Sequence, residues 1–222
     1  KADGTLGSTF HFTGDYTIDF WIRFNTLGSV QRIFGQRNAD GSDIGVLLEW
    51  DNSLGKLMYY YSTNGSTTYY FSLGGTSDFS TDTWYHIAIL GINGLGQGYR
   101  DGVFTEVGNG EVVGINHGDS TFSIGRQGEY TANAFNGYIS NFRIRQGAHY
   151  KNNFTVPQFE SKVEPGTILL CCQSSSSTTE FAVSPDTITA NGDPTASSFA
   201  PDIRKDITDT GVVFEDNTKF DT

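Results

Sequence analysis

The chain has 222 residues, of which 27 are glycine, 14% are aromatic and only 18% are charged. This length and composition favour one large all-β domain, in which short strands are joined by tight turns and almost no helix forms. The net charge of −11 opposes binding to nucleic acid or to an anionic membrane surface, whereas it allows neutral glycans or calcium as partners.

Alternating apolar residues predict the first strands. Residues 17–24 read TIDFWIRF, and every second side chain is apolar, as expected for a strand with one face against a core. Two further strands are predicted at residues 32–36 and 44–50, followed by a turn at residues 52–55. Residues 1–9 are expected to form a loop.

Residues 56–73 are predicted to form a hairpin, because Asn64-Gly65 is a preferred pair for a two-residue turn with positive φ at both positions. That turn would place Tyr60 opposite Tyr69 and Met58 opposite Phe71. We expect Met58 and Phe71 to mark the core face of the hairpin. The opposite face would then present three tyrosines to solvent as a platform for sugar rings: Tyr59, Tyr61 and Tyr70.

Further strands are expected at residues 82–92, 99–107, 121–127, 135–144 and 167–173. Asp101-Gly102 is a predicted turn within the second of these segments. The strand predicted at residues 135–144 alternates strictly. One face carries Tyr138, Ser140, Phe142 and Ile144, and the other carries Ile139, Asn141, Arg143 and Arg145. About ten short strands with turns between them are typical of a β-sandwich.

The adjacent residues Cys171 and Cys172 are expected to be free thiols. A disulfide between neighbours would close a strained ring, and successive side chains of a strand point to opposite faces. A Ser/Thr-rich loop at residues 174–179 would follow, with short extended pieces at residues 188–192 and 211–220.

The order of these motifs resembles the laminin-G/pentraxin type of concanavalin A-like domain over residues 10–173. The strings that carry the resemblance are YTIDFWIRF, RIFGQ, GKLMYYYS, DTWYHIAIL, YRDGVF, FSIGR and FNGYISNFRI. The last of these, with GAHYKNNFTVP, TILLCCQ and TANGDPTASSF after it, is similar to lectin-like domains in virion proteins of tailed bacteriophages, especially those of marine cyanobacteria. The resemblance implies an antiparallel jelly roll of two sheets packed face to face.

The C-terminal end departs from the family pattern. The strand that usually opens such domains is missing from the N-terminal end, whereas residues 211–222 read GVVFEDNTKFDT and resemble it. We therefore predict a lectin-like domain at residues 1–173 and an extension at residues 174–222. The strand at 211–220 would belong to a tandem array, complete its own sandwich, or join a neighbouring subunit through an open sheet edge. Its central apolar residues would make that assembly contact: Val212, Val213 and Phe214.

Enzymatic chemistry is not expected. Hydrolases among the relatives of this fold use three carboxylates at alternate positions, and here Glu49 and Asp51 are followed by Ser53. Trp84 and His86 match a W-x-H pattern of the family, and we expect both to be packing residues. The four histidines show no zinc spacing.

Calcium is the ion that a lectin-like sandwich favours. Its candidate ligands lie in predicted loops, and each is also an ordinary turn residue: Asp40, Asp43, Asp101 and Asp119.

These observations predict a non-enzymatic virion structural or adhesion protein, located at the virion surface or outside the cell. Its partners would be a cell-surface polysaccharide or other virion subunits, and homo-oligomers are among the expected assemblies. Neither insertion into a membrane nor binding to nucleic acid is expected. Two alternatives stay open: a purely structural assembly module joined through its C-terminal strand, and a repeat of a cellular extracellular adhesin.

Overall fold

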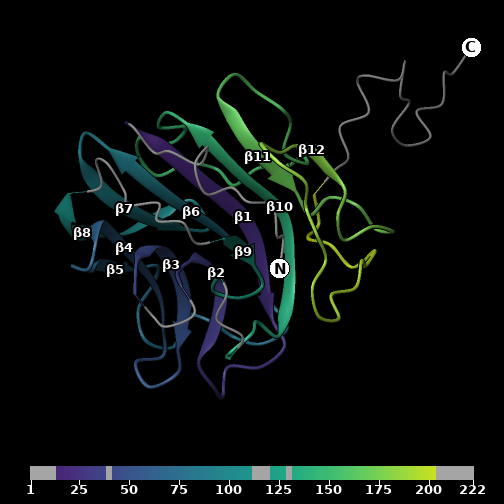
Figure 1. The fold of residues 1–222 in the computed structure, drawn as a ribbon, viewed down its shortest axis with the longest axis horizontal. Coiled ribbons are helices and arrows are strands. Elements are labelled where there is room, and N and C mark those ends of the chain that lie inside the picture. The colour runs from purple at the N-terminus through teal and green to yellow at the C-terminus, as the bar shows by residue number, and fades with distance from the viewer. Residues whose placement is uncertain (1–13, 39–41, 112–120, 129–131, 204–222) are drawn as a thin grey trace, which may run out of the picture.

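The computed structural model describes residues 14–38, 42–111, 121–128 and 132–203 (Figure 1). These residues form twelve β-strands and no helix. No helix long and apolar enough to span a bilayer occurs in this described part of the chain. The strands are Tyr16–Phe24 (β1), Gln31–Gln36 (β2), Ile44–Asp51 (β3), Lys56–Gly65 (β4), Tyr69–Ser72 (β5), Trp84–Ile92 (β6), Leu95–Arg100 (β7), Val103–Glu111 (β8), Phe122–Ile124 (β9), Gly137–Gln146 (β10), Thr167–Cys171 (β11) and Phe181–Val183 (β12).

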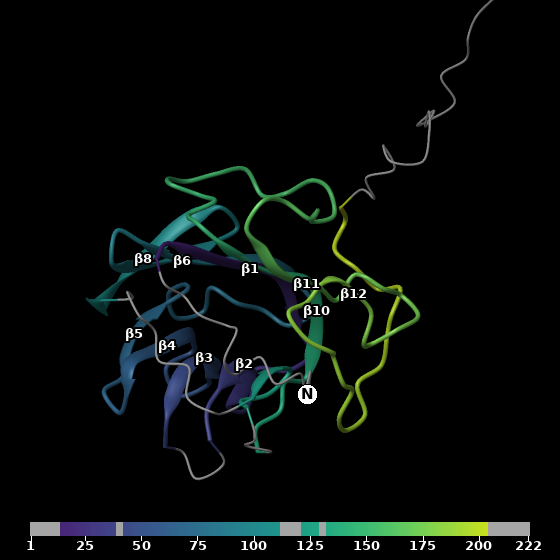
Figure 2. The same ribbon diagram turned by 45° about the horizontal axis from the view of Figure 1, so that its top comes forward.

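The strands form two antiparallel sheets that lie face to face as two layers (Figure 2). The seven-stranded sheet has the order β12-β11-β10-β1-β6-β7-β8, and the five-stranded sheet has the order β5-β4-β3-β2-β9. This architecture confirms the predicted all-β jelly-roll sandwich.

An aromatic core fills the space between the two sheets. Ile18, Phe20, Ile22 and Phe24 of β1 are all buried there, as the alternation in this strand predicts. The ring of Phe34, from the opposite sheet, lies 5.9 Å from that of Phe20 in an edge-to-face arrangement. Because aromatic rings bury large areas and favour such geometry, this cluster is the main source of cohesion between the layers.

The β4–β5 hairpin differs from its predicted register by one residue. Tyr61 pairs with Tyr69, and Tyr59 pairs with Phe71. Only Gly65 of the predicted turn pair has a positive φ (77°), so the two-residue turn does not form. Instead, the Asn64 side chain accepts hydrogen bonds from the backbone N–H groups of Ser66 and Thr67 at 2.9 and 2.7 Å.

This shift exchanges the two faces of β4, because side chains alternate along a strand, whereas Phe71 and Tyr70 of β5 keep their predicted core and solvent faces. Tyr59 and Tyr61 are fully buried in the core beside Phe71. Met58 lies on the opposite face, next to Ser72 in the adjacent strand. The prediction that Tyr59 and Tyr61 point outward is therefore wrong, as is the prediction that Met58 marks the core face.

Strict alternation also fails in β10. The pairing of β10 with β1 shifts between Asp19 and Trp21, and Asn141 has a positive φ of 54°. This bulge resets the alternation, because an extra residue reverses the side-chain direction on one side of it. Ile139 consequently packs against the core, whereas Tyr138 lies beside Arg23 on the outer face.

The two cysteines are free thiols, as predicted, although they do not lie on opposite faces. Cys171 ends β11, and Cys172 has a positive φ of 61°, which turns its side chain out of the strand pattern. The two Sγ atoms lie 3.6 Å apart, and both residues pack against the core cluster.

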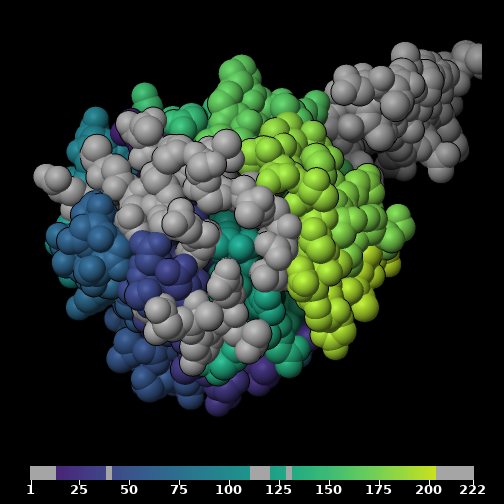
Figure 3. Space-filling model, viewed as in Figure 1, coloured from purple at the N-terminus to yellow at the C-terminus, as the bar shows by residue number. Residues whose placement is uncertain are grey.

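Residues after β11 gather over one flank of the sandwich (Figure 3). They include β12, a strand that sequence patterns do not predict, whereas the predicted extended piece at 188–192 forms no strand. Ile188 of this segment is buried and joins the core cluster. The predicted strand at 211–220, with Val212, Val213 and Phe214, lies outside the described residues. The division into domains at residue 173 stays a prediction.

Candidate functional site

A buried ion pair lies on the outer face of the seven-stranded sheet. Arg143 of β10 donates from Nε and Nη2 to the two carboxylate oxygens of Asp19 in β1, each at 2.9 Å. The Tyr150 hydroxyl donates to the same carboxylate at 3.0 Å, and His86 Nε2 lies 3.8 Å from it. Asp19, Arg143 and His86 are almost fully enclosed.

The charge of Asp19 depends on these neighbours. Burial alone would raise the pKa of Asp19, but His86 and Arg143 together hold that pKa well below its usual range. The two 2.9 Å hydrogen bonds make Arg143 the principal partner, since the His86 nitrogen is beyond hydrogen-bonding distance. His86 also packs edge-to-face against Trp21 and Phe154. Its predicted packing role is confirmed.

The ion pair anchors a loop, residues 147–154, that crosses this outer face. Tyr150 reaches down to Asp19, and its ring stacks on that of Phe154 at 3.6 Å and 9°. Thr17 Oγ1 donates to the Gly147 carbonyl and accepts from the His149 N–H, each at 2.9 Å. Polar contacts with Thr17 and Asp19 therefore hold the first half of this docking loop on the sheet, and the ring stack joins Tyr150 to Phe154 at its far end.

The β7–β8 turn receives the far end of the docking loop. Asp101 and Gly102 have φ values of 50° and 77°, as a two-residue hairpin turn requires, which confirms the predicted turn. The Phe154 N–H donates to the Gly102 carbonyl at 2.9 Å. A Cβ at Gly102 would collide with the carbonyl oxygen of Phe154. Glycine is needed here both for the conformation and for the close approach.

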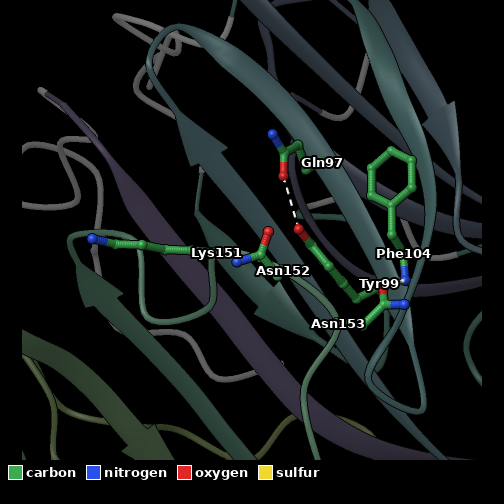
Figure 4. Close-up of a pocket in the computed structure, with 6 residues that line it drawn as sticks. All are labelled: Gln97, Tyr99, Phe104, Lys151, Asn152 and Asn153. Atoms are coloured by element: carbon green, nitrogen blue, oxygen red, sulfur yellow. Dashed lines mark hydrogen bonds between the residues drawn. The ribbon is translucent and has the colours of Figure 1, made fainter.

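The docking loop and strands β7 and β8 border an open hollow of about 460 Å³. The residues that line it are Gln97, Tyr99, Phe104, Lys151, Asn152 and Asn153 (Figure 4). Tyr99 donates from its hydroxyl to Gln97 Oε1 at 2.9 Å, and Asn153 Oδ1 accepts from the Phe104 N–H at 2.8 Å. Lys151 extends away from Phe104. The hollow thus combines amide and hydroxyl groups with two aromatic rings.

Phe104 is the exposed aromatic residue of the hollow. It is 45% exposed, whereas Tyr99 beneath it is buried. The two rings lie 5.7 Å apart in an edge-to-face arrangement, because Tyr99 and Phe104 are cross-strand partners. Burial raises the pKa of Tyr99, so its hydroxyl stays protonated as a hydrogen-bond donor at neutral pH. Phe104 therefore presents an accessible ring at the edge of a polar hollow.

A second hollow, of about 430 Å³, lies on the other side of Phe104. Arg100 and Asp78 form an ion pair there at 3.1 Å, and Glu106 accepts hydrogen bonds from the N–H and hydroxyl of Ser72. Arg100, Asp78 and Glu106 thus each have a polar partner within this hollow. They close the side of the sandwich between β8 and β5.

The predicted sugar platform does not exist as a set of three tyrosines. Tyr70 is exposed at 49%, but its neighbour on that surface is Tyr60, whose ring lies 6.0 Å away. Burial, with the negative charges of Glu49 and Asp51, raises the pKa of Tyr60 to about 12. The surface pair on the five-stranded sheet is therefore Tyr60 and Tyr70.

Two of the four candidate calcium ligands, Asp43 and Asp101, lie within the described residues. Asp43 and Asp101 have positive φ values of 51° and 50°, which fits turn residues, and Asp101 Oδ1 accepts a hydrogen bond from the His86 N–H. Asp40 and Asp119 lie outside the described residues. Across the described ranges, no group of three or more acidic, histidine or cysteine side chains could hold a metal ion.

The partial hydrolase motif has structural roles. Glu49 accepts a hydrogen bond from Arg32 Nε at 3.1 Å. Asp51 Oδ1 accepts from the Ser53 and Leu54 N–H groups and so stabilises the turn that follows β3.

Sequence patterns do not reveal the hollow. Its residues come from two segments about fifty positions apart, and those of the docking loop lie in a stretch without periodicity. The available signals are the Asp101-Gly102 turn, which implies a hairpin, and an aromatic residue directly after it.

Comparisons with known proteins agree with this fold. A model of the concanavalin A-like lectin/glucanases superfamily matches residues 3–149. A candidate carbohydrate binding protein from Bacteroides ovatus is 19% identical with a TM-score of 0.62, and the match covers 83% of this chain and 54% of that one. This chain thus spans about half of the Bacteroides protein.

Two other solved structures are similar to part of the chain. A heptameric SAP-like pentraxin from Limulus polyphemus is 20% identical with a TM-score of 0.46, over 62% of this chain and 66% of that one. Domains LG4-5 of the mouse laminin alpha1 chain are 13% identical with a TM-score of 0.45, over 61% and 36%. No curated protein matches the chain. The match over residues 3–149, together with the two-sheet sandwich, shows that the chain belongs to the concanavalin A-like lectin/glucanases superfamily.

Proposed function

We propose that the chain is a non-catalytic carbohydrate-binding module and that the hollow beside Phe104 is its sugar site. The observation that carries this proposal is an exposed aromatic ring next to the amide groups of Gln97 and Asn152. A pyranose offers C–H groups that pack on a flat ring and hydroxyls that exchange hydrogen bonds with amides.

The net charge of the chain and the residues that line the hollow restrict the class of ligand and the activity that we propose. The net charge of −11 disfavours acidic polysaccharides and leaves neutral glycans. The described residues that line the hollow include no carboxylate, whereas glycoside hydrolysis uses a pair of them on either side of the scissile bond. Binding without cleavage is therefore the expected activity.

The test compares two phenylalanines of nearly equal exposure, Phe104 at 45% and Phe159 at 47%. We expect Phe104→Ala to weaken binding to a responsive neutral oligosaccharide at least tenfold, equivalent to about 1.4 kcal/mol. Phe159→Ala is the matched control and should leave binding unchanged. Affinity is measured by calorimetry after a screen of immobilised glycans. Equal binding by the native chain and Phe104→Ala would exclude this hollow as the sugar site.

We also propose a setting for the module, in a structural or adhesion protein at the surface of a virion. Support comes from the resemblance of the strings FNGYISNFRI, GAHYKNNFTVP, TILLCCQ and TANGDPTASSF, within residues 135–199, to lectin-like domains of tailed-phage virion proteins. Binding of the purified chain to intact host cells, competed by the oligosaccharide found in the screen, would test it. A repeat of a cellular adhesin is the alternative setting, and the genes adjoining the coding sequence would distinguish the two.

A second candidate function is assembly with further copies of this chain. The observation that favours it is a row of exposed apolar side chains on one face of β7 and β8: Leu95, Phe104 and Val107. Exposed apolar patches mark interfaces of several kinds. Light scattering of the chain and of Val107→Ser tests this function. A stable oligomer that the substitution dissociates would support it, and a monomeric native chain would exclude it.

A further inference from the structure

We propose a second carbohydrate-binding platform, formed by Arg23, Trp84 and Tyr138, which Phe199 of the C-terminal segment occupies as a stand-in for a sugar ring. The platform lies on the same outer face as the hollow but shares no residue with it. Ligand binding there would displace Phe199.

The platform is built by three neighbouring strands of the seven-stranded sheet. Arg23 of β1 pairs with Trp84 of β6 on one side and with Tyr138 of β10 on the other. Cross-strand partners share a face, so the three side chains lie in one row across the sheet. The bulge at Asn141 contributes, because it turns Tyr138 out of the core and into this row.

Phe199 covers the row with its aromatic ring. Its centroid lies 6.0 Å from Trp84 in a stacked arrangement of 27°, and 5.2 Å from Tyr138. The guanidinium carbon of Arg23 lies 4.7 Å from the Phe199 centroid. Phe199 is nevertheless 49% exposed, so one side of its ring stays accessible to solvent. The ring therefore rests on the platform without being enclosed by it.

Phe199 packs on the rings of the platform but leaves two of its hydrogen-bond donors unpaired within the described residues. In this described part of the chain, Trp84 Nε1 and Arg23 Nε are buried donors that find no protein acceptor for a hydrogen bond. A phenyl ring cannot accept such bonds well, and a buried donor without a partner is costly. A pyranose would supply both a C–H face for the rings and hydroxyl oxygens for the two donors. This mismatch is the observation that points to a hydroxylated ligand.

Polar groups suited to sugar hydroxyls surround the platform. Arg23 Nη1 donates to Asn25 Oδ1 at 3.1 Å, and Asn25 Nδ2 donates to Asn136 Oδ1 at 3.0 Å. Asp82, an exposed carboxylate, forms an ion pair with Arg23. An aromatic base with amides and a carboxylate at its rim is the chemistry that binds neutral pyranoses.

The C-terminal segment can release Phe199 without breaking a strand. Residues 192–195 are exposed, and the upstream part of the segment is held separately by Ile188 in the core and by β12. The hydrogen bonds of Phe199 and Ile203 are local, to Ser197 and Pro201. Figure 3 shows these last described residues on the flank of the sandwich. Displacement of Phe199 would thus sacrifice ring contacts and leave the sheet intact.

The experiment removes the Phe199 ring from a chain in which Phe104→Ala has already removed the aromatic ring of the hollow. NMR titrations with the methyl glycosides of glucose, galactose and mannose compare Phe104→Ala with the double variant Phe104→Ala/Phe199→Ala. We expect the double variant to bind at least one glycoside about three- to tenfold more tightly, because the ligand no longer competes with Phe199. Adding Trp84→Ala to the double variant should abolish this binding. Phe104→Ala/Phe181→Ala is the control for loss of an exposed phenylalanine elsewhere on the flank.

The outcomes separate the two proposals. No gain on removal of Phe199, or binding that persists without Trp84, would overturn the platform whatever the hollow does. Weaker binding without Phe199 would also overturn the displacement, since Phe199 would then be part of the site. Unfolding curves of each variant establish that it is folded. If Phe104→Ala alone binds sugar as tightly as the native chain, that result excludes the hollow as a sugar site and leaves the test of the platform unchanged.

Discussion

Asp19 anchors the docking loop that forms one side of the hollow. Its carboxylate accepts two hydrogen bonds from Arg143 and one from Tyr150. The bond from Tyr150 attaches the docking loop to the sheet. The pair is enclosed, so removing one partner would leave an uncompensated buried charge. Loss of the Asp19–Arg143 ion pair should therefore lower the free energy of unfolding as well as the affinity for sugar.

We expect Asp19→Asn to lower the free energy of unfolding by about 3–5 kcal/mol, because Arg143 would lose its charged partner inside the protein. The matched control is Asp82→Asn, which removes the carboxylate of an exposed ion pair with Arg23. Surface pairs contribute about 1 kcal/mol or less. Urea unfolding of both variants measures the difference. Equal losses would show that the Asp19–Arg143 pair is not the buried anchor described above.

At the scale of elements, the β7–β8 hairpin and the docking loop define the site together. The hairpin supplies Tyr99 and Phe104, and the loop supplies Asn152 and Asn153. Their junction is the hydrogen bond from Phe154 to Gly102. A change at this junction should alter both stability and sugar binding.

We expect Gly102→Ala to be more destabilising than Gly147→Ala. Both glycines have positive φ, at 77° and 88°, so both substitutions carry a similar backbone cost of about 1 kcal/mol. At Gly102 the added Cβ would also collide with the docking loop, whereas at Gly147 no atom of the described residues lies within 4 Å of it. Calorimetric affinity and urea midpoints are measured for both. Sugar binding should fall in Gly102→Ala and persist in Gly147→Ala, and the reverse order would contradict the docked loop.

The register of the β4–β5 hairpin can be tested with its tyrosines. We expect Tyr59→Ala to lower the unfolding free energy by about 3–5 kcal/mol, because it leaves a cavity in the core. Tyr70→Ala, in the adjacent strand on the opposite face, should change it by about 1 kcal/mol or less. The measurement is denaturant unfolding. Similar costs for the two substitutions would favour the unshifted register, in which both tyrosines share the solvent face.

At the scale of the whole molecule, the two sheets are joined along one side by strands β5 and β8. Glu106 accepts hydrogen bonds from Ser72, and Asn109 Oδ1 accepts from the Tyr70 N–H at 2.9 Å. These side chains cover the free edge of β5, which would otherwise offer its backbone to another chain. The sandwich is thus closed on the side where Phe104 and the hollow lie.

Acid should destabilise the folded chain. The folded-state pKa of Asp19 lies below its unfolded value of about 3.9, so its ionised form contributes stability that is fully present above that value. This contribution is lost as the pH falls from there through the folded-state pKa. We expect the urea midpoint to fall between pH 6 and pH 2.5. The fall should be smaller in Asp19→Asn, and an equal fall in both chains would contradict the assigned role of Asp19.

What the sequence by itself determined is local. Alternation predicts β1 and its core face correctly, and turn chemistry predicts the Asp101-Gly102 hairpin, because both depend on residues adjacent in the chain. The number and spacing of such strands were enough to predict the two-sheet sandwich.

Tertiary structure decided which side chains meet. A one-residue shift at Asn64 and a bulge at Asn141 reverse side-chain directions, so that Tyr59 is buried and Tyr138 lies on the outer face of the sheet. The hollow likewise depends on a loop that crosses a sheet about fifty residues after the strands it meets. Contacts of this kind are selected by packing and by buried pairs such as Asp19–Arg143, and neither leaves a periodic signal in the sequence.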